Sequence, residues 1–226
     1  MIAVDLPGHG RSSAPTDPLR YTLVRTAKDL TRVLDELELE QVAVYGYSMG
    51  GRAAIRFALD HPDRVVSLIL ESTSPGIERA SDRAQRVAAD MTLADLIERE
   101  GIEAFVARWE QLPLWENQKV LPEASRRALR EQRLANDPHG LANSLRGAGT
   151  GVDADVFDRI PEIDIPTLIL AGELDEKYVE LGRRMEKELV HGELKIVEHA
   201  GHSIHLEQPD AVIDQVRTFL VKTRNA

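Results

Sequence analysis

The sequence predicts an α/β protein with a parallel sheet, crossover helices and a helical insertion. Short apolar runs alternate with helix-like stretches in residues 1–75 and again in residues 152–226. This alternation is typical of parallel strands joined by helices. Between them, residues 76–151 are rich in Arg and Glu and contain no convincing strand. We therefore expect a core made of residues 1–75 and 152–226, with residues 76–151 forming a helical cap.

The first half of the predicted core begins with an apolar run. Residues 1–4 are predicted to form a buried strand that leads into a turn at residues 5–10. Leu23, Ala27, Leu30, Leu34 and Leu37 recur at helical spacing and predict an amphipathic helix over about residues 22–38. The next predicted elements are a strand at 42–45, a helix at 49–59 and a strand at 65–70.

The insertion and the second half of the core follow. Helical patterns in the insertion cover about 79–90, 92–99, 102–112 and 122–134. After Pro161 the alternation resumes, with a strand at 166–171, a helix at 178–190, a strand at 194–197 and a closing helix at 209–222.

Composition excludes several classes of protein. The 226 residues carry a net charge of −10 (28 basic and 38 acidic residues), which argues against nucleic acid or an anionic membrane as a partner. Zero cysteines exclude disulfides, thiolate catalysis and cysteine-bound metals. No apolar run approaches the ~20 residues of a membrane span, and no signal-peptide pattern is present. A cytoplasmic protein is expected, and no feature indicates an oligomeric state.

A serine motif lies between a predicted strand and a predicted helix. The segment Gly46-Tyr47-Ser48-Met49-Gly50-Gly51 has the form G-x-S-x-G in the context that a nucleophile elbow requires. Glycines on either side permit a tight turn that exposes the Ser48 hydroxyl. The Met49 N–H would lie at a helix N-terminus, where it can donate to an oxyanion. Ser48 is therefore the candidate base or nucleophile.

An acid and a histidine follow two later strands. Active sites in open parallel sheets lie beyond the carboxyl ends of the strands. Asp175 follows the strand at 166–171, with Glu173 as a competitor for the role. His202 follows the strand at 194–197 and is preferred over the nearby His199 and His205. The chain order Ser, Asp, His matches triads of this topology, in which the histidine accepts the serine proton and the acid fixes its tautomer. A metal site in this histidine cluster lacks a carboxylate pattern such as H-E-x-x-H.

Arg52 lies one helical turn after Ser48. A guanidinium at this place would bind a carboxylate through two hydrogen bonds. The alternative is that Arg52 only pairs with a nearby acid.

These residues carry a family resemblance. The chain resembles the α/β-hydrolase fold through Asp5-Leu6-Pro7-Gly8-His9-Gly10, the serine elbow and Gly201-His202 with Glu207 and Pro209. More narrowly, it resembles the 2-succinyl-6-hydroxy-2,4-cyclohexadiene-1-carboxylate synthases of the menaquinone pathway. The segments that carry this narrower resemblance are residues 46–52, residues 71–76, Trp109 with residues 112–114, and residues 140–147.

The resemblance implies an elimination rather than a hydrolysis. Ser48, deprotonated through His202 and Asp175, would act as the base that removes a ring proton and so expels pyruvate from a cyclohexene tricarboxylate. No cofactor or metal is implied, and the partner is this small-molecule substrate. The family positions for substrate binding correspond to Tyr47, Arg52, Arg86, Trp109, Arg133, Lys177 and Tyr178.

Several of these residues have a structural alternative. Arg86 and Arg133 could be solvated charges on cap helices, and Trp109 could belong to the core of the cap. Asn143 and Arg146 could serve only to stabilise the cap.

The resemblance begins abruptly at residue 1. Family members carry earlier strands and a His-Gly loop that supplies a second oxyanion N–H, and His9 belongs to a different turn. We therefore expect an N-terminally truncated α/β-hydrolase fold, with an unpaired edge at residues 1–4, poor solubility or weak activity. Two alternatives to the lyase remain: a carboxylesterase or C–C bond hydrolase of the same fold, and an inactive fragment.

Overall fold

The computed structural model describes residues 1–153 and 155–224 and divides them into two compact units. Unit 1 comprises Met1–Thr26, Gly76–Pro113 and Leu121–Ala154, and unit 2 comprises Ala27–Pro75, Leu114–Val120 and Asp155–Ala226. This division differs from the expected boundaries in two segments. Residues 1–26 group with the helical insertion, and residues 114–120 of the insertion group with the sheet.

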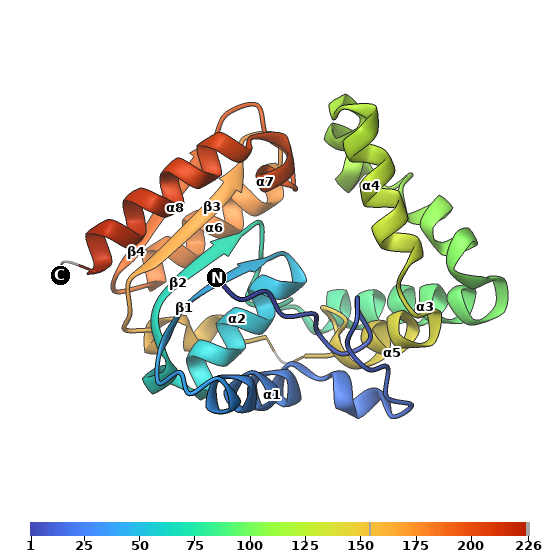
Figure 1. Cartoon of the computed structure of the whole chain (residues 1–226), viewed down its shortest axis with the longest axis horizontal. Coiled ribbons are helices and arrows are strands. Elements are labelled where there is room, and N and C mark those ends of the chain that lie inside the picture. The colour runs from blue at the N-terminus through green and yellow to red at the C-terminus, as the bar shows by residue number, and fades with distance from the viewer. Residues whose placement is uncertain (154, 225–226) are drawn as a thin grey trace. The chain divides into compact units, whose positions relative to one another are not determined.

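Unit 2 is built on four parallel strands in the order β1-β2-β3-β4 (Figure 1). The strands are β1 (Val42–Tyr47), β2 (Val65–Glu71), β3 (Thr167–Gly172) and β4 (Gly192–Val197). Each lies within two residues of its predicted bounds. The prediction of a parallel α/β sheet is confirmed.

Helices cover the two faces of this sheet separately (Figure 1). On one face, Leu70 and Ile169 pack with side chains of α1 (Leu23–Glu36), α2 (Met49–Asp60) and α6 (Glu176–Glu188). On the other, Ile69 and Leu168 pack with α7 (Ile204–Glu207) and α8 (Pro209–Arg224). Successive residues of a strand point to opposite faces, so neighbouring residues of β2 and β3 serve different apolar clusters. Unit 2 also contains the 3-10 segments η2 (Pro62–Arg64) and η4 (Phe157–Glu162).

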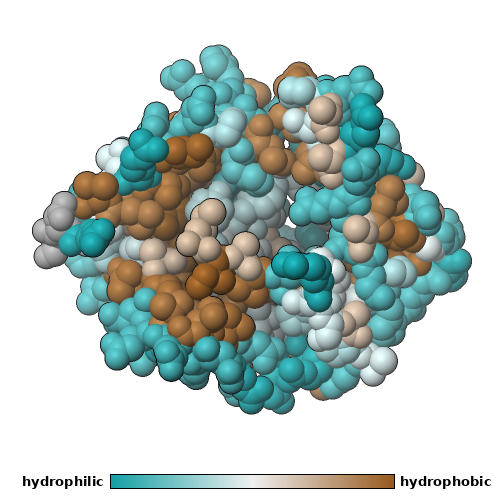
Figure 2. Space-filling view, viewed as in Figure 1, coloured by the Kyte–Doolittle hydropathy of each residue, from teal (hydrophilic) through white to brown (hydrophobic). Residues whose placement is uncertain are grey.

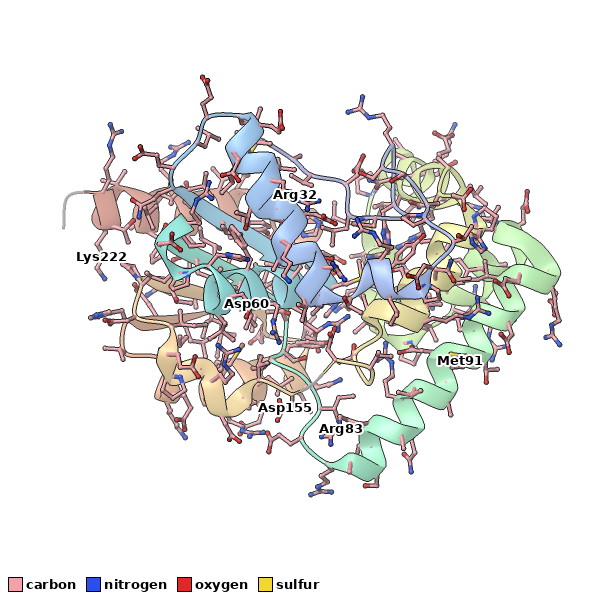
Figure 3. All side chains as sticks on the ribbon, turned by 90° about the horizontal axis from the view of Figure 1, so that it is seen from below. Arg32, Asp60, Arg83, Met91, Asp155 and Lys222 are labelled. Atoms are coloured by element: carbon pink, nitrogen blue, oxygen red, sulfur yellow. The ribbon has the colours of Figure 1, made fainter. Side chains whose placement is uncertain are left out.

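The surface of unit 2 carries both exposed charged side chains and exposed apolar ones. Arg32 on α1 and Lys222 on α8 project outward and are largely exposed (Figure 3). Apolar residues also gather on the surface over the strands and α8 (Figure 2). On β1, Val42 and Val44 pack against the helical cluster, whereas Ala43 and Tyr45 on the opposite face are exposed. One face of this edge strand is therefore only lightly covered by the described residues.

Unit 1 is helical. It contains η1 (Pro18–Tyr21), α3 (Ala80–Trp109), α4 (Glu123–Leu134) and α5 (Pro138–Ala148). The predicted helices at 79–90 and 92–99 form one continuous stretch of α3. Its interruption comes later, at Gly101, with φ 83° and ψ −179°. That φ favours glycine, so Gly101 divides α3 into two parts, the second of which begins where the helix predicted at 102–112 begins. The apolar core of the unit joins α3 to α5 through Ile97, Val106 and Ala142.

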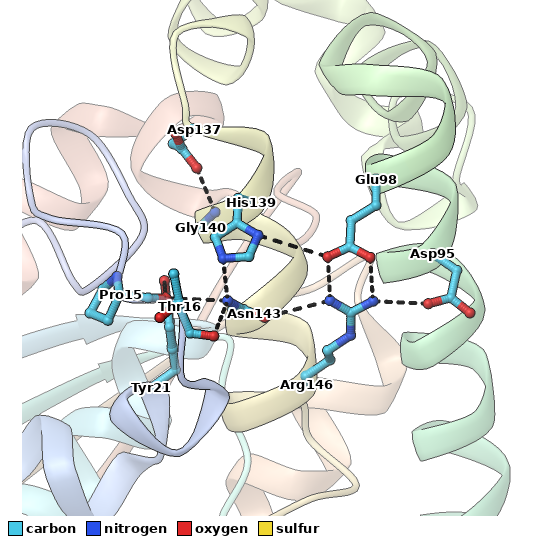
Figure 4. Close-up of polar contacts among 10 residues, drawn as sticks. All are labelled: Pro15, Thr16, Tyr21, Asp95, Glu98, Asp137, His139, Gly140, Asn143 and Arg146. Atoms are coloured by element: carbon cyan, nitrogen blue, oxygen red, sulfur yellow. Dashed lines mark hydrogen bonds and ion pairs between the residues drawn. The ribbon is translucent and has the colours of Figure 1, made fainter.

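Residues 140–147, one of the segments behind the family resemblance, form most of α5 and pack against the N-terminal loop. A Cβ on Gly140 would lie 2.7 Å from the Gly8 Cα, and one on Gly147 would lie 2.1 Å from the Pro18 carbonyl oxygen. The buried Asn143 donates from Nδ2 to the carbonyls of Pro15 and Thr16, at 3.2 Å each (Figure 4). These contacts explain why residues 1–26 belong to unit 1.

An ion-pair cluster joins α5 to α3 (Figure 4). The Arg146 guanidinium donates to Glu98 at 2.6 and 2.8 Å and to Asp95 at 2.9 Å. The hydrogen bond to Arg146 lowers the pKa of the Glu98 carboxyl, and the same bond raises the pKa of Arg146. Asn143 and Arg146 thus make contacts that stabilise the helical unit, as expected if their role is structural.

The predicted strand at residues 1–4 is wrong. Residues 1–6 adopt no regular secondary structure, and Met1, Ile2 and Val4 are exposed. An apolar run becomes a strand only when a neighbour completes its hydrogen-bond ladder. Within the described residues, this segment pairs with no strand.

Candidate active site

Ser48 lies on a sharp turn between β1 and α2 in unit 2. Its φ of 49° and ψ of −111° are rare for a residue with a side chain. Two contacts hold this backbone in place. The Ser48 N–H donates to the Glu71 carbonyl at 2.9 Å, and the Thr73 hydroxyl donates to the Ser48 carbonyl at 2.7 Å. The turn has the form of a nucleophile elbow.

The glycines around Ser48 do different things. A Cβ on Gly46 would lie 2.4 Å from the Gly50 carbonyl oxygen, and one on Gly51 would lie 2.5 Å from the Thr73 Cβ. A Cβ on Gly50 would meet no atom within 4 Å. The close approach of the strand, the helix and Thr73 therefore requires Gly46 and Gly51, whereas Gly50 is not needed for space.

The ends of three strands bring Ser48, His202 and Asp175 together. The His202 Nε2 lies 3.0 Å from the Ser48 Oγ, and its Nδ1 lies 2.7 Å from the Asp175 Oδ2. The His202 side chain is only 1% exposed and that of Asp175 11% exposed. In this arrangement the imidazole can take the serine proton while the carboxylate holds it in the tautomer that does so.

The competing residues have other partners. The Glu173 carboxylate accepts the backbone N–H of His199 at 3.0 Å. His205 directs its Nδ1 to Glu71 at 2.8 Å. Neither Glu173 nor His205 occupies the position that Asp175 and His202 hold beside Ser48.

Three aromatic rings surround the His202 imidazole. The ring centroids of Tyr47, Tyr178 and Trp115 lie 5.4, 4.7 and 5.5 Å from that of His202. Burial raises the pKa of the Tyr47 hydroxyl, which lies 2.9 Å from the Ser203 Oγ. Tyr47 therefore uses its hydroxyl to hold the histidine loop, and the three rings keep water from the imidazole.

Trp115 and Gln118 were not identified from the sequence. Both belong to η3 (Pro113–Val120), whose residues 114–120 group with the sheet rather than with the helical insertion. Gln118 is buried and donates to the Ser203 Oγ at 2.8 Å. The one available signal was Trp115, a large aromatic residue that directly follows Pro113-Leu114.

The loop that carries His202 is clamped from two sides. Glu207 accepts the backbone N–H groups of Gly201 and Ser203. A Cβ on Gly172 would lie 2.1 Å from the Gly201 carbonyl oxygen, so the loop lies directly on the end of β3. Glu207 was part of the fold resemblance, and the structure gives it this local role.

The remaining predicted site residues of unit 2 lie on two helices near the triad. Met49 begins α2 directly after Ser48, which places its N–H at a helix N-terminus. Arg52 lies in the next turn, its N–H donating to the Ser48 carbonyl at 3.2 Å and its Nη1 buried. Lys177 and Tyr178 lie in the first turn of α6, just after Asp175, with the Lys177 ammonium 5.2 Å from the centroid of the Tyr178 ring.

The three predicted site residues of unit 1 have partners within that unit. Arg86 donates from Nε to both oxygens of the buried Asp90 at 2.9 Å. Arg133 donates to Glu110 at 3.1 Å. The Trp109 ring lies 5.4 Å from that of Phe105 and lines an apolar cavity of about 160 Å³.

The described part of the chain holds no group of three or more His, Cys, Asp or Glu side chains placed to bind a metal ion. Within residues 1–153 and 155–224, none of the helices combines the length and apolar character needed to span a bilayer.

Comparison with known proteins places this geometry in a family. The family profile described as alpha/beta hydrolase fold matches residues 1–209. A Bacillus subtilis (strain 168) protein, named provisionally as a 2-succinyl-6-hydroxy-2,4-cyclohexadiene-1-carboxylate synthase, is 45% identical over 97% of this chain and 80% of its own length. The synthase of that name from Serratia proteamaculans (strain 568) is 31% identical over 97% of this chain and 82% of its own.

A solved structure agrees. The structure of MenH from S. aureus superposes with a TM-score of 0.94 at 38% identity, covering 98% of this chain and 83% of that one. The identities and the shared architecture extend over both the sheet and the helical insertion. The chain therefore belongs to the 2-succinyl-6-hydroxy-2,4-cyclohexadiene-1-carboxylate synthase family of the α/β-hydrolase fold.

Proposed function

We propose that this protein is a carbon–oxygen lyase of menaquinone biosynthesis. It removes pyruvate from 2-succinyl-5-enolpyruvyl-6-hydroxy-3-cyclohexene-1-carboxylate and leaves 2-succinyl-6-hydroxy-2,4-cyclohexadiene-1-carboxylate. The observation that carries the proposal is the Ser48–His202–Asp175 geometry, with Arg52 one helical turn from the serine, in a chain of this family.

The bond changes follow from the two chemical structures. The substrate double bond joins C3 and C4, and the product carries double bonds at C2 and C4. The proton therefore leaves C2, the electron pair moves through the ring, and the C5–oxygen bond breaks to release enolpyruvate, which becomes pyruvate. The succinyl carbonyl is attached to C2, so it accepts negative charge as the proton leaves.

The triad supplies the base. His202 takes the Ser48 proton through Nε2, and the resulting alkoxide removes the C2 proton. The imidazolium then gives its proton to the departing enolpyruvate, so Ser48 and His202 return to their starting states. Asp175 stabilises the imidazolium that forms. The aromatic rings around His202 keep water away, which strengthens this electrostatic stabilisation. The elimination transfers no electrons between substrate and enzyme, so the reaction needs no redox cofactor.

The Met49 N–H is the proposed donor to the succinyl oxyanion. It lies at the N-terminus of the 12-residue helix α2, where the backbone dipoles favour negative charge. A donor aimed at charge that develops in the transition state typically contributes about 10²–10³ in rate.

Charged and aromatic side chains are the proposed ligands of the substrate carboxylates and ring. In unit 2 these are Arg52, Lys177, Tyr178 and the ring of Tyr47. In unit 1 the family resemblance proposes Arg86, Arg133 and Trp109. A substrate carboxylate would have to compete with Asp90 for Arg86 and with Glu110 for Arg133. Arg52 is the first choice for carboxylate recognition because it lies one helical turn after Ser48. The cytoplasmic location expected from the sequence remains part of this proposal.

A coupled assay tests the function. The protein is incubated with the enolpyruvyl substrate, and pyruvate release is followed through lactate dehydrogenase and NADH. A chromogenic short-chain ester is offered separately. Pyruvate release that depends on Ser48 supports the lyase. Ester turnover without pyruvate release would instead identify a hydrolase of the same fold.

A further inference from the structure

We propose that Glu71, paired with His205, is a positioning residue that sets the distance between Ser48 and His202. The inference rests on the proposed role of the triad. It concerns a buried carboxylate that the mechanism above does not use and that no sequence argument assigned.

The Glu71 side chain is fully buried, yet donors surround it. Its Oε1 accepts from the His205 Nδ1 at 2.8 Å and from the His205 backbone N–H at 3.1 Å. The Tyr45 hydroxyl donates to the other carboxylate oxygen. A buried carboxylate is tolerated only when such donors replace its water. Glu71 therefore holds the His205 ring, the His205 backbone and the Tyr45 hydroxyl in place.

The main chain of the same residue holds the other half of the triad. Glu71 ends β2 opposite Tyr47, and its carbonyl accepts the Ser48 N–H at 2.9 Å. Its carboxylate meanwhile holds His205, three residues after His202. One residue thus binds the backbone of the serine turn and the start of the helix that follows the catalytic histidine.

A ring contact transmits the same constraint. The His205 and Tyr47 rings meet edge to face with centroids 4.7 Å apart, and Tyr47 in turn lies 5.4 Å from His202. Tyr47 directly precedes Ser48. If His205 were released from Glu71, it would lose its fixed orientation against this ring, and the Ser48–His202 contact of 3.0 Å would loosen.

Glu71 acts through other residues rather than on substrate. Within the part of the chain that the structure describes, its carboxylate forms no hydrogen bond with the Ser48 hydroxyl or the His202 ring, and Asp175 already holds the His202 Nδ1. Loss of Glu71 should therefore lower kcat and leave substrate binding largely intact.

The primary test compares Glu71→Met with Glu71→Gln. Methionine removes both acceptor oxygens at similar length, whereas glutamine keeps one oxygen for His205. Two rates are measured: pyruvate release, and phosphonylation of Ser48 by a fluorophosphonate, which needs the Ser–His pair but not the substrate. For Glu71→Met we expect both rates to fall about 10²-fold, the loss that a ~1 Å misplacement of Ser48 relative to His202 would cause. KM should be nearly unchanged. Glu71→Gln should lose much less.

A second pair of variants covers the case in which Glu71→Met does not fold. His205→Ala removes the Nδ1 donor, and His205→Asn supplies an amide donor in its place. Phosphonylation should be slow in His205→Ala and partly restored in His205→Asn. Glu186→Gln is the control, because Glu186 also accepts a backbone N–H, from Leu194 at 2.8 Å, without touching the triad. It should match the parent chain.

The outcomes separate this inference from the proposed function. Variants that lose thermal stability but keep normal phosphonylation when folded would overturn the positioning role, as would a rise in KM alone. If the parent chain released no pyruvate, the proposed function would fail, but slower phosphonylation in Glu71→Met would still support the positioning role.

Discussion

In unit 2, Ser48 and His202 are 154 positions apart in the chain and meet at 3.0 Å because parallel strands end at one edge of the sheet. In unit 1, Arg86 pairs with Asp90 one helical turn away, and Arg146 pairs with acids of the neighbouring helix α3. The acid and the histidine of the triad thus converge on a serine in unit 2, whereas in unit 1 Arg86 forms an ion pair within α3 and Arg146 holds α5 to α3. The role of an arginine in this chain is therefore best inferred from the residues that it contacts, because residue type alone does not distinguish the two regions.

The largest expected effect tests whether unit 2 carries the chemistry. Ser48→Ala should reduce pyruvate release by at least ~100-fold, the scale of general base catalysis. Folding should be unaffected, because the hydroxyl lies at a turn and contributes little packing. The coupled assay and a thermal melt measure both. Near-normal turnover in Ser48→Ala would mean that His202 alone is the base.

The next effect compares an arginine from each region. Arg52→Ala should weaken binding of the tricarboxylate by about 1.5–3 kcal/mol, the value of a charged hydrogen bond, and leave turnover of a neutral ester unchanged. Arg52→Lys should also be defective, because an ammonium cannot replace the planar fork. KM for the two substrates is the measurement.

Arg133→Ala is the matched variant in unit 1. Because Arg133 pairs with Glu110, we expect a lower melting temperature and a smaller change in KM than for Arg52→Ala. Equal losses of Arg52→Ala on both substrates would assign Arg52 a structural role and remove the contrast between the regions.

A third prediction concerns the glycines of the serine turn. Gly51→Ala should lower the free energy of unfolding by about 1–3 kcal/mol, because its Cβ would overlap Thr73. Gly50→Ala should raise it by up to about 1 kcal/mol, since alanine favours a helix and the space is open. Urea unfolding of both variants measures whether their free energies of unfolding change in opposite directions. Two equal destabilisations would show that Gly50 is also sterically required.

The smallest effect is a pH dependence in unit 1. The hydrogen bond from Arg146 lowers the pKa of Glu98 in the folded protein. The resulting stabilisation is present above the ordinary glutamate value of about 4.5 and is lost as the pH falls through the lower folded-state pKa. Glu98 is 40% exposed, so the contribution is at most about 1 kcal/mol.

Arg146→Ala should therefore flatten the fall in unfolding free energy between about pH 5 and pH 3. Arg99→Ala, which removes an exposed charge from α3, the helix that carries Glu98, is the control. Parallel pH curves for the parent chain and Arg146→Ala would contradict the assignment.

The sequence predicted the strands and the place of the triad because both depend on local signals. Apolar runs mark β1 to β4, and the residue that follows each strand must lie at the active edge. The helix α5 was missed because Gly140 and Gly147 lower helix propensity. Those glycines serve close contacts with Gly8 and Pro18, more than 120 residues away in the chain, that no local pattern reveals.

The roles of Glu71, Trp115 and Gln118 were out of reach for the same reason. Each of these roles depends on a residue in or next to the His202 loop. Gln118 lies 85 residues before its partner Ser203, and Glu71 lies 134 residues before its partner His205. The strand predicted at residues 1–4 failed for the converse reason. The local signal was strong, but within the described residues no strand lies beside it.

Residues 114–120 have a consequence for engineering this fold. They sit within the insertion by sequence, yet they place Trp115 and Gln118 against the loop of the proposed catalytic histidine. Recombining residues 76–151 between family members would therefore not be a neutral exchange of modules. A chimaera made at these boundaries would carry residues 114–120 of the donor protein next to His202 of the recipient. Its turnover would therefore depend on how well those residues pack against the recipient's His202 loop.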